Sequence, residues 1–316
     1  MKKFLIFILL LVFLAAPLVF DRYTLSVLVF ALYMACVGQS WNLLLGYSGQ
    51  LSLGHALYSG LGGYCAVAFF MHLGVSPFLA IPACFLLCAC LGASIVLLSF
   101  RFGIKNVQFT LLTIAFAHCC QVIFEHWPFF GANGGLFVPL CDSRNIWNLR
   151  MDMAHFYYLF LFLCAFIFIS LWGLIRHTKL GYFAKAVRDN EISAQALGVP
   201  THWVKMYIMA LSAGLTAICG AFYAFYQNNL FPDQAFSSLR SVELMMGPIF
   251  GGIGTLAGPI IGSFLLVPLG ETLNYFLGEH IVGVKHLFYG FIILLVMMRF
   301  PKGLWPVWKK RWEALP

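Results

Sequence analysis

The sequence predicts an all-α protein, a polytopic transmembrane helical bundle. Hydrophobic residues make up 62% of the 316 residues and charged residues only 9%, whereas soluble domains carry roughly 25% charged residues. A soluble protein of this size would not have enough charge to cover its surface, so lipid must surround most of it. The apolar residues also form runs of about 20 residues, the length of a helix that crosses a bilayer.

Ten apolar segments follow one another along the chain, and we expect each to be a helix. Only helices and closed barrels satisfy their backbone hydrogen bonds in hydrocarbon, and these segments are too long and too uniformly apolar for barrel strands. The eighth segment is short for a span. The segments are residues 4–20, 24–45, 51–73, 77–100, 107–126, 155–175, 203–226, 241–253, 256–276 and 285–300.

The first segment resembles a secretory signal, because Lys2 and Lys3 precede an apolar run. Pro17, however, stands where a small-residue cleavage site would end, and further spans follow at once. We therefore expect a retained first helix. Cleavage would not change the orientation of the later spans.

Basic residues set the expected orientation, since cytoplasmic loops carry an excess of lysine and arginine. With the N-terminus inside, ten spans leave both termini cytoplasmic and place most of the 19 basic residues there. Trp305, Trp308 and Trp312 beside the basic tail fit an interfacial anchor. The cytoplasmic residues are Lys2, Lys3, Arg101, Lys105, Arg176, Lys179, Lys185, Arg188, Lys205, Arg299, Lys302, Lys309, Lys310 and Arg311; the outer ones are Arg22, Arg144, Arg150, Arg240 and Lys285.

Composition also disfavours several other functions. The net charge of +8 reflects basic loops, and no cluster of aromatic and basic residues resembles a nucleic-acid surface, so we expect no nucleic-acid partner. All ten cysteines but Cys141 fall in apolar stretches, which indicates packed side chains rather than disulfides. We recognise no metal-ligand spacing. Few acidic residues lie deep in a span, which weakens the case for an ion-coupled transporter.

Four polar residues lie at or near membrane depth, in or beside the second and third predicted segments: Asn42, Gln50, Ser52 and His55. Such groups are costly at membrane depth and usually face the bundle interior or water. Two interpretations stay open, hydrogen bonding between helices and contact with a solute path. Gly54 and the glycines that follow it favour close helix packing or a helix break beside a cavity.

Three other polar residues near spans receive structural interpretations. We expect His118 to be packed and hydrogen-bonded rather than a ligand. Arg240 and Glu243 lie at the edge of a predicted span and are expected to be interfacial.

A second glycine-rich stretch covers residues 247–262 and predicts a turn at the cytoplasmic face. Helix propensity is poor there, and prolines interrupt the stretch. It is not a phosphate loop, because no Gly-Lys-Ser/Thr follows and no strand precedes it. The residues expected to allow packing or a helix break are Gly251, Gly252, Gly254, Gly258 and Pro259.

Two loops stand out by length. Residues 127–154 are expected outside and contain a glycine-rich segment with Asn133, Gly134 and Gly135. Residues 176–202 are expected inside and form the most charged stretch of the chain.

The cytoplasmic loop predicts one or two short helices outside the membrane. Residues 184–188 favour a helix, and Asp189 or Asn190 is suited to cap a second one with Glu191 in its first turn. Gly198 suits the position after a helix C-terminus, with Pro200 soon after. The small residues of this helix would let another protein approach closely. A solvated connector with basic anchors is the alternative.

Four segments together resemble the LivM-type permease of branched-chain amino acid ABC transporters. They occur in that family's order over most of the chain, and the ending RFPKGLW (299–305) also looks similar. The segments are NLLLGYSGQLSLGH (42–55), LTIAFA (112–117), VRDNEISAQALG (187–198) and GGIGTLAGPIIG (251–262).

The resemblance implies one permease domain over residues 1–316, in the bacterial plasma (inner) membrane. Such permeases bind no cofactor directly; two cytoplasmic ATP-binding subunits use ATP. The other implied partners are a sister LivH-like permease and an extracytoplasmic solute-binding protein. Residues 176–202 would be the coupling loop, with Glu191, Ala194 and Gly198 aligned to the coupling motif and Arg188 beside them.

The outer segment around Asn133, Gly134 and Gly135 only loosely resembles a Thr-Gly-Gly-rich segment common in the family, and we add it to the candidate solute path. Because of this difference, a urea or short-amide permease stays an alternative. A stand-alone secondary transporter and an intramembrane enzyme are alternatives of other classes. The enzyme would need a nucleophile–base pair, for which Ser52 and His55 are the candidates.

Overall fold

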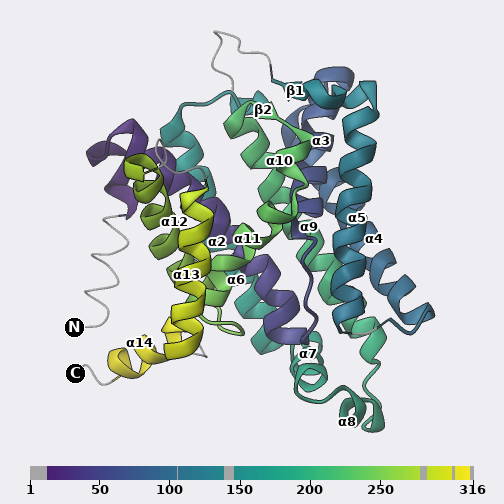
Figure 1. Ribbon diagram of the computed structural model, residues 1–316. Coiled ribbons are helices and arrows are strands. Elements are labelled where there is room, and N and C mark those ends of the chain that lie inside the picture. The colour runs from purple at the N-terminus through teal and green to yellow at the C-terminus, as the bar shows by residue number, and fades with distance from the viewer. Residues whose placement is uncertain (1–12, 105, 139–145, 278–282, 301–302, 314–316) are drawn as a thin grey trace.

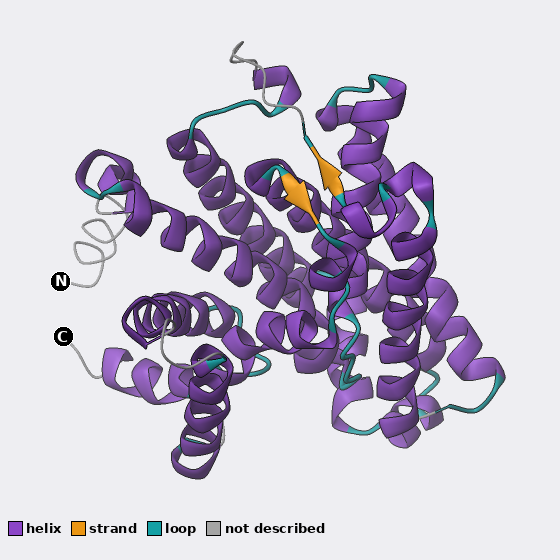
Figure 2. Cartoon of the chain, turned by 45° about the horizontal axis from the view of Figure 1, so that its top comes forward, coloured by secondary structure: helices purple, strands orange, loops and turns teal. Residues whose placement is uncertain are grey.

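The structure, a computed structural model, is almost entirely helical, with two short strands (Figure 2). It describes residues 13–104, 106–138, 146–277, 283–300 and 303–313. The chain is an all-α polytopic membrane protein, because six described helices are long and apolar enough to cross a bilayer. These are α2 (Arg22–Ser48), α3 (His55–Leu73), α4 (Pro77–Arg101), α5 (Val107–His126), α6 (Met153–His177) and α9 (Thr201–Gln227).

Further helices and two short strands make up the rest of the described elements, and three of them, α11, α12 and α13, correspond to the last three predicted segments. The first segment falls largely on residues outside the described ranges, as do Lys2, Lys3, Lys105, Arg144 and Lys302. The shorter elements are η1 (Pro128–Phe130), η2 (Ala132–Gly134), β1 (Leu136–Phe137), η3 (Ile146–Asn148), α7 (Lys179–Asp189), α8 (Glu191–Ala196), β2 (Asn229–Leu230), α10 (Pro232–Ala235), α11 (Ser238–Gly251), α12 (Gly258–Leu277), α13 (Val284–Arg299) and α14 (Leu304–Glu313).

The core lies where α2, α3 and α9 meet, and small residues let these helices approach closely. A methyl group on Gly62 of α3 would lie 2.2 Å from the carbonyl oxygen of Ala217 in α9. One on Gly220 would lie 2.1 Å from the carbonyl oxygen of Ser59. Glycine at these positions therefore sets the spacing between α3 and α9, as expected for close packing of transmembrane helices.

The two ends of the bundle differ in structure. Helices α7, α8 and α14 lie at one end, at the bottom of Figure 1, and the pairing of β1 with β2 lies toward the other end. Arg101, Arg176 and Arg299 stand in the last turns of α4, α6 and α13, at the α7–α8 end. The described basic residues of the predicted cytoplasmic loops thus gather at one end of the molecule.

The glycine-rich stretch after α11 forms the predicted turn, and α12 returns along α2. Gly252 and Gly254 both have positive φ, at 131° and 76°, which favours glycine. A methyl group on Gly251 would collide with Gly258, so the two helix ends touch. Pro248 lies inside α11, whereas Pro259 stands in the first turn of α12, where a missing N–H costs little.

Candidate functional site

A cavity of about 450 Å³ lies among α2, α3, α9, α10 and α11. That volume falls within the roughly 300–1,000 Å³ typical of small-molecule sites. Its wall combines charged, polar and apolar groups. The lining residues are Tyr33, Ser59, Gly60, Gly220, Tyr223, Ala224, Gln227, Asn229, Leu230, Phe231, Asp233, Gln234, Ala235, Ser237, Leu239, Arg240 and Glu243.

Arg240 is the cation of this cavity, and three aromatic rings surround it. Its guanidinium carbon lies 5.2 Å from the ring centroid of Phe30, 5.4 Å from that of Tyr33 and 5.5 Å from that of Tyr223. Tyr33 and Tyr223 stack on each other at 4.0 Å. Cation–π attraction grows when the cation is desolvated, so the rings stabilise the charge and restrict its position.

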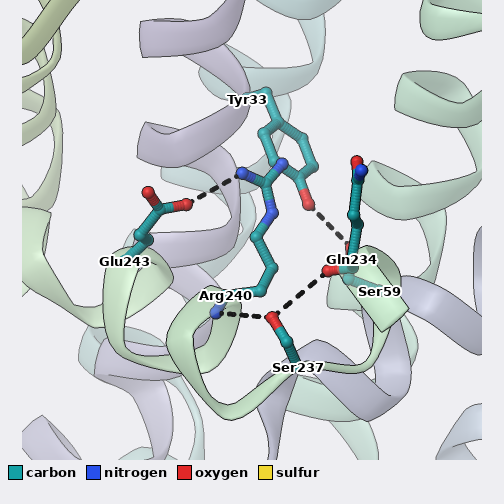
Figure 3. Close-up of polar contacts among 6 residues, drawn as sticks. All are labelled: Tyr33, Ser59, Gln234, Ser237, Arg240 and Glu243. Carbon is teal, nitrogen blue, oxygen red and sulfur yellow. Dashed lines mark hydrogen bonds and ion pairs between the residues drawn. The ribbon is translucent and has the colours of Figure 1, made fainter. Parts of the chain in front are cut away.

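Glu243 neutralises Arg240 one helical turn along α11. Nη1 of Arg240 donates to Oε2 of Glu243 over 3.0 Å, and only 19% and 11% of the two side chains are exposed. A charge inside a membrane bundle is expensive unless paired. Both residues lie on the wall of the first cavity, and Figure 3 shows the ion pair that joins them.

Hydrogen bonds fix the surroundings of Arg240. Ser237 caps α11, since its hydroxyl accepts from the Arg240 backbone amide at 3.1 Å (Figure 3). The hydroxyl groups of Tyr33 and Ser59 lie 2.7 Å apart. From the first turn of α11, the Arg240 side chain reaches Phe30 and Tyr33 of α2 and Tyr223 of α9.

A second cavity, of about 350 Å³, adjoins the first. Phe231, Asp233 and Gln234 line both cavities, while Glu125 and Asn133 line only the second. The two cavities therefore share part of their wall. Asn133 of the predicted path lies on this wall; Gly134 ends η2, and Gly135, with φ of 75°, packs closely against the carbonyl oxygen of Leu230.

A polar face of α5 continues from the second cavity. Nε2 of His118 lies 3.0 Å from the hydroxyl of Ser238, and its Nδ1 lies 3.3 Å from Oε1 of Gln121. Gln121 in turn donates to Glu125 at 2.8 Å. His118 is exposed in the chain, not packed as expected. Exposed polar side chains on a transmembrane helix require a partner or water, because lipid satisfies none of them.

Three residues expected near a solute path lie instead in packed contacts. Asn42 accepts from the amide of Gly254 at 2.8 Å and donates to the carbonyl of Thr255 at 2.7 Å, which holds the glycine-rich turn. Ser52 and His55 are fully buried. The alternative interpretation, hydrogen bonding between helices, describes these contacts.

Ser52 and His55 also have separate partners, which leaves no support for a catalytic pair. The hydroxyl of Ser52 accepts from the amide of Gly54 at 3.3 Å. Nε2 of His55 lies 2.9 Å from the hydroxyl of Ser212. That hydroxyl donates a hydrogen bond to the carbonyl oxygen of Ser40 over 2.6 Å. Gly54 packs against α5: a methyl group there would lie 2.4 Å from the carbonyl oxygen of Thr113.

The loop between α6 and α9 contains the two predicted short helices, and several polar contacts attach them to the bundle. Nη1 of Arg188 donates to the carbonyl oxygen of Gly46 at 2.8 Å. Lys205 of α9 pairs with Glu191 at 2.6 Å. Asn190 caps α8 by accepting from the amide of Ser193. Gly198 follows the C-terminus of α8 with φ of 84°.

The exposed apolar residues of α8 are the feature that the sequence interpretation missed. Ala194 is buried against the bundle, whereas Ile192 and Leu197 are 80% and 85% exposed. The signal was present, since Ile192 lies in a short capped helix outside the apolar spans and Leu197 is the C-cap residue of that helix. Large apolar groups exposed together at one end of a bundle indicate a contact with another protein.

A third cavity, of about 330 Å³, lies beside α8. Gln50, expected on the solute path, lines it together with Glu191 and Lys205. Gln50 thus lies at the α7–α8 end, away from Arg240.

Comparison with known proteins identifies the family. The profile described as "Branched-chain amino acid transport system / permease component" matches residues 23–297. The chain belongs to this family. Its membership makes the chain a permease component of an ABC importer, and the LivM-type resemblance predicted from the four segments is confirmed.

Curated relatives extend the comparison. The high-affinity branched-chain amino acid transport system permease protein LivM of Escherichia coli (strain K12) is 24% identical over 97% of this chain and 75% of its own length. A probable LivH permease protein of Methanocaldococcus jannaschii is 25% identical over 76% of both chains. A ribose import permease protein, RbsC, of Haemophilus influenzae is 23% identical over 36% of both. No solved structure matches this chain.

Proposed function

We propose that this chain is the permease subunit of an ABC importer for branched-chain amino acids, driven by ATP hydrolysis in partner subunits. The observation that carries the proposal is the helix pair α7–α8, which is bonded to the bundle and presents Ile192 and Leu197 outward. A permease that binds no nucleotide itself needs such a contact, through which the movement of an ATPase subunit is coupled to the membrane helices.

The coupling contact depends on both sides of α8. Ile192 and Leu197 dock on a cytoplasmic ATP-binding subunit, and Arg188 and Glu191 transmit its movement through Gly46 and Lys205. Ala194 and Gly198 set the shape of α8 rather than its outer surface. In this assignment the chain crosses a bacterial plasma membrane ten times. The α7–α8 end and both termini then lie on the cytoplasmic side.

The solute path runs through the first two cavities and along the face of α5. His118 and Gln121 lie on that face and do not point into a packed core. A sister LivH-like permease provides the opposite wall, and an extracytoplasmic solute-binding protein delivers the solute near Asn133. The polar face of α5 supports this arrangement, since lipid cannot cover it.

Branched-chain amino acids are the best-supported solutes. The proteins named LivM and LivH match over most of this chain, whereas the ribose permease matches over about a third of it. The cavity wall also offers apolar groups beside charged ones. A urea or short-amide permease is the second candidate, because the outer segment around Asn133 departs from the family pattern.

Reconstitution tests this function. The chain, its sister permease, two ATP-binding subunits and the binding protein are placed in liposomes, and radiolabelled leucine uptake is measured with and without ATP. We expect uptake only when ATP and all subunits are present. Uptake by this chain alone, driven by an ion gradient, would establish a secondary transporter instead.

A further inference from the structure

We propose that Arg240 binds the carboxylate of the transported solute, so that the first cavity selects zwitterionic amino acids over uncharged amides. The inference rests on the proposed function, and it names the group on the solute that this chain recognises.

The guanidinium of Arg240 is suited to this role by its place on the cavity wall. It has five N–H donors in a planar fork that matches a carboxylate, and the bond to Glu243 uses Nη1. Arg240 lines the cavity, and 19% of its side chain is exposed. A carboxylate there would gain charge-assisted hydrogen bonds.

The aromatic rings make Arg240 a rigid receptor. Its guanidinium carbon lies within 5.5 Å of the ring centroids of Phe30, Tyr33 and Tyr223. Tyr33 is in turn held by its contact with Ser59 and by stacking on Tyr223. A side chain that is already ordered loses less entropy when a ligand binds.

The rest of the cavity complements the other parts of an α-amino acid. Asp233 supplies negative charge for an ammonium group, and apolar surface for an aliphatic side chain comes from Leu230, Phe231 and Ala224. Urea carries neither charge, so it would form no ionic contact with Arg240 or Asp233. The wall therefore favours a small apolar zwitterion.

A purely structural ion pair is the competing explanation, and a double variant separates the two. Arg240→Gln alone would leave Glu243 as an unpaired charge in the bundle, which is strongly destabilising. Arg240→Gln together with Glu243→Gln removes both charges and keeps polar side chains of similar size. A structural pair would tolerate this exchange, whereas a carboxylate receptor would not.

The first experiment uses the complete transporter in proteoliposomes, with radiolabelled leucine and a saturating amount of loaded binding protein. We expect the double variant to assemble normally and to lose at least about tenfold in uptake rate, with Arg240→Lys intermediate because lysine lacks the planar fork. Arg22→Gln, an exposed arginine at the start of α2, is the control and should transport normally. Double-variant uptake within about twofold of wild type would overturn the proposal.

The second experiment needs no variant. Radiolabelled leucine bound to the wild-type permease complex in nanodiscs is competed with 4-methylpentanoate, which lacks the ammonium group, or with leucinamide, which lacks the carboxylate. We expect 4-methylpentanoate to compete at least about tenfold better; equal competition would overturn the proposal. A wild-type complex without ATP-driven uptake would instead refute the proposed function itself.

Discussion

Nη1 of Arg188 in α7 donates to the carbonyl oxygen of Gly46 in α2 over 2.8 Å, which joins residues 142 positions apart in the chain. Gly46 also packs against Gly254 in the turn that leads to α12. One side chain of the helix pair therefore contacts both the end of α2 and the turn between α11 and α12. A displacement of α7 would reach α11, which carries Arg240.

Removal of this link should uncouple ATP hydrolysis from transport. We predict that Arg188→Gln lowers ATP-driven leucine uptake by about tenfold or more, since a charge-assisted bond to a carbonyl contributes ~1.5–3 kcal/mol. Association with the ATP-binding subunits should persist, because Ile192 and Leu197 are unchanged. Pull-down and uptake on the same preparation check both parts. Lys179→Gln, at an exposed position at the start of α7, is the control; equal uptake by the two variants would contradict the coupling role.

The docking surface of α8 makes a separate prediction. Leu197→Asp places a charge where an apolar contact is proposed, so we expect loss of ATPase-subunit binding while membrane insertion is kept. Leu197→Met retains an apolar side chain of similar size and should bind normally. The measurement is co-purification of the ATP-binding subunits. Normal co-purification with the aspartate variant would place the docking surface elsewhere.

Asn42 offers a test of stability. Its loss leaves the amide of Gly254 and the carbonyl of Thr255 without a partner. We expect Asn42→Leu to destabilise the bundle by about 2–4 kcal/mol, since each unsatisfied buried group costs roughly 1–3 kcal/mol. Thermal unfolding in detergent should show a clear decrease in melting temperature. Ser94→Ala, at an exposed site on α4, should leave it unchanged.

Gly62 tests the spacing of α3 and α9. Gly62→Ala would force a methyl group against the carbonyl oxygen of Ala217, and overpacking typically costs ~1–3 kcal/mol. Gly173→Ala on α6 is the matched control, because its methyl group would meet no atom within 4 Å. We expect reduced yield and a lower melting temperature only for Gly62→Ala. Equal stability of the two variants would mean that α3 and α9 can separate without cost.

The sequence predicted the helices well, because a bilayer demands long apolar runs and each run can be recognised by itself. The cap at Asn190 and the position of Gly198 were also predictable, since capping depends on neighbouring residues. The cavity was not. Arg240 stands at the start of α11, and only the contacts with Tyr33 and Tyr223, on distant helices, show that it faces inward.

For Asn42, Ser52 and His55 the sequence left two roles open, hydrogen bonding between helices and contact with a solute path. A polar residue at membrane depth must be satisfied, but sequence does not say by which helix. Tertiary contacts with Thr255 and Ser212 decide it here. The polar face of α5 is the converse case. Its polar residues can be recognised in the sequence, but only the fold shows that they do not pack against the core.

Cross-linking from Leu197 tests the central claim most directly. The Leu197→Cys variant is assembled into the complete complex. A thiol-directed cross-linker should then join position 197 to an ATP-binding subunit. Only reagents that reach the cytoplasm should label the thiol at this position. We predict that ATP changes the yield of that product. Because Cys141 lies in the predicted outer loop, the unsubstituted chain is the reference. Labelling of the variant above that reference, by an impermeant reagent added outside intact cells, would contradict the account, because α8 would then lie on the opposite side of the membrane from any ATPase.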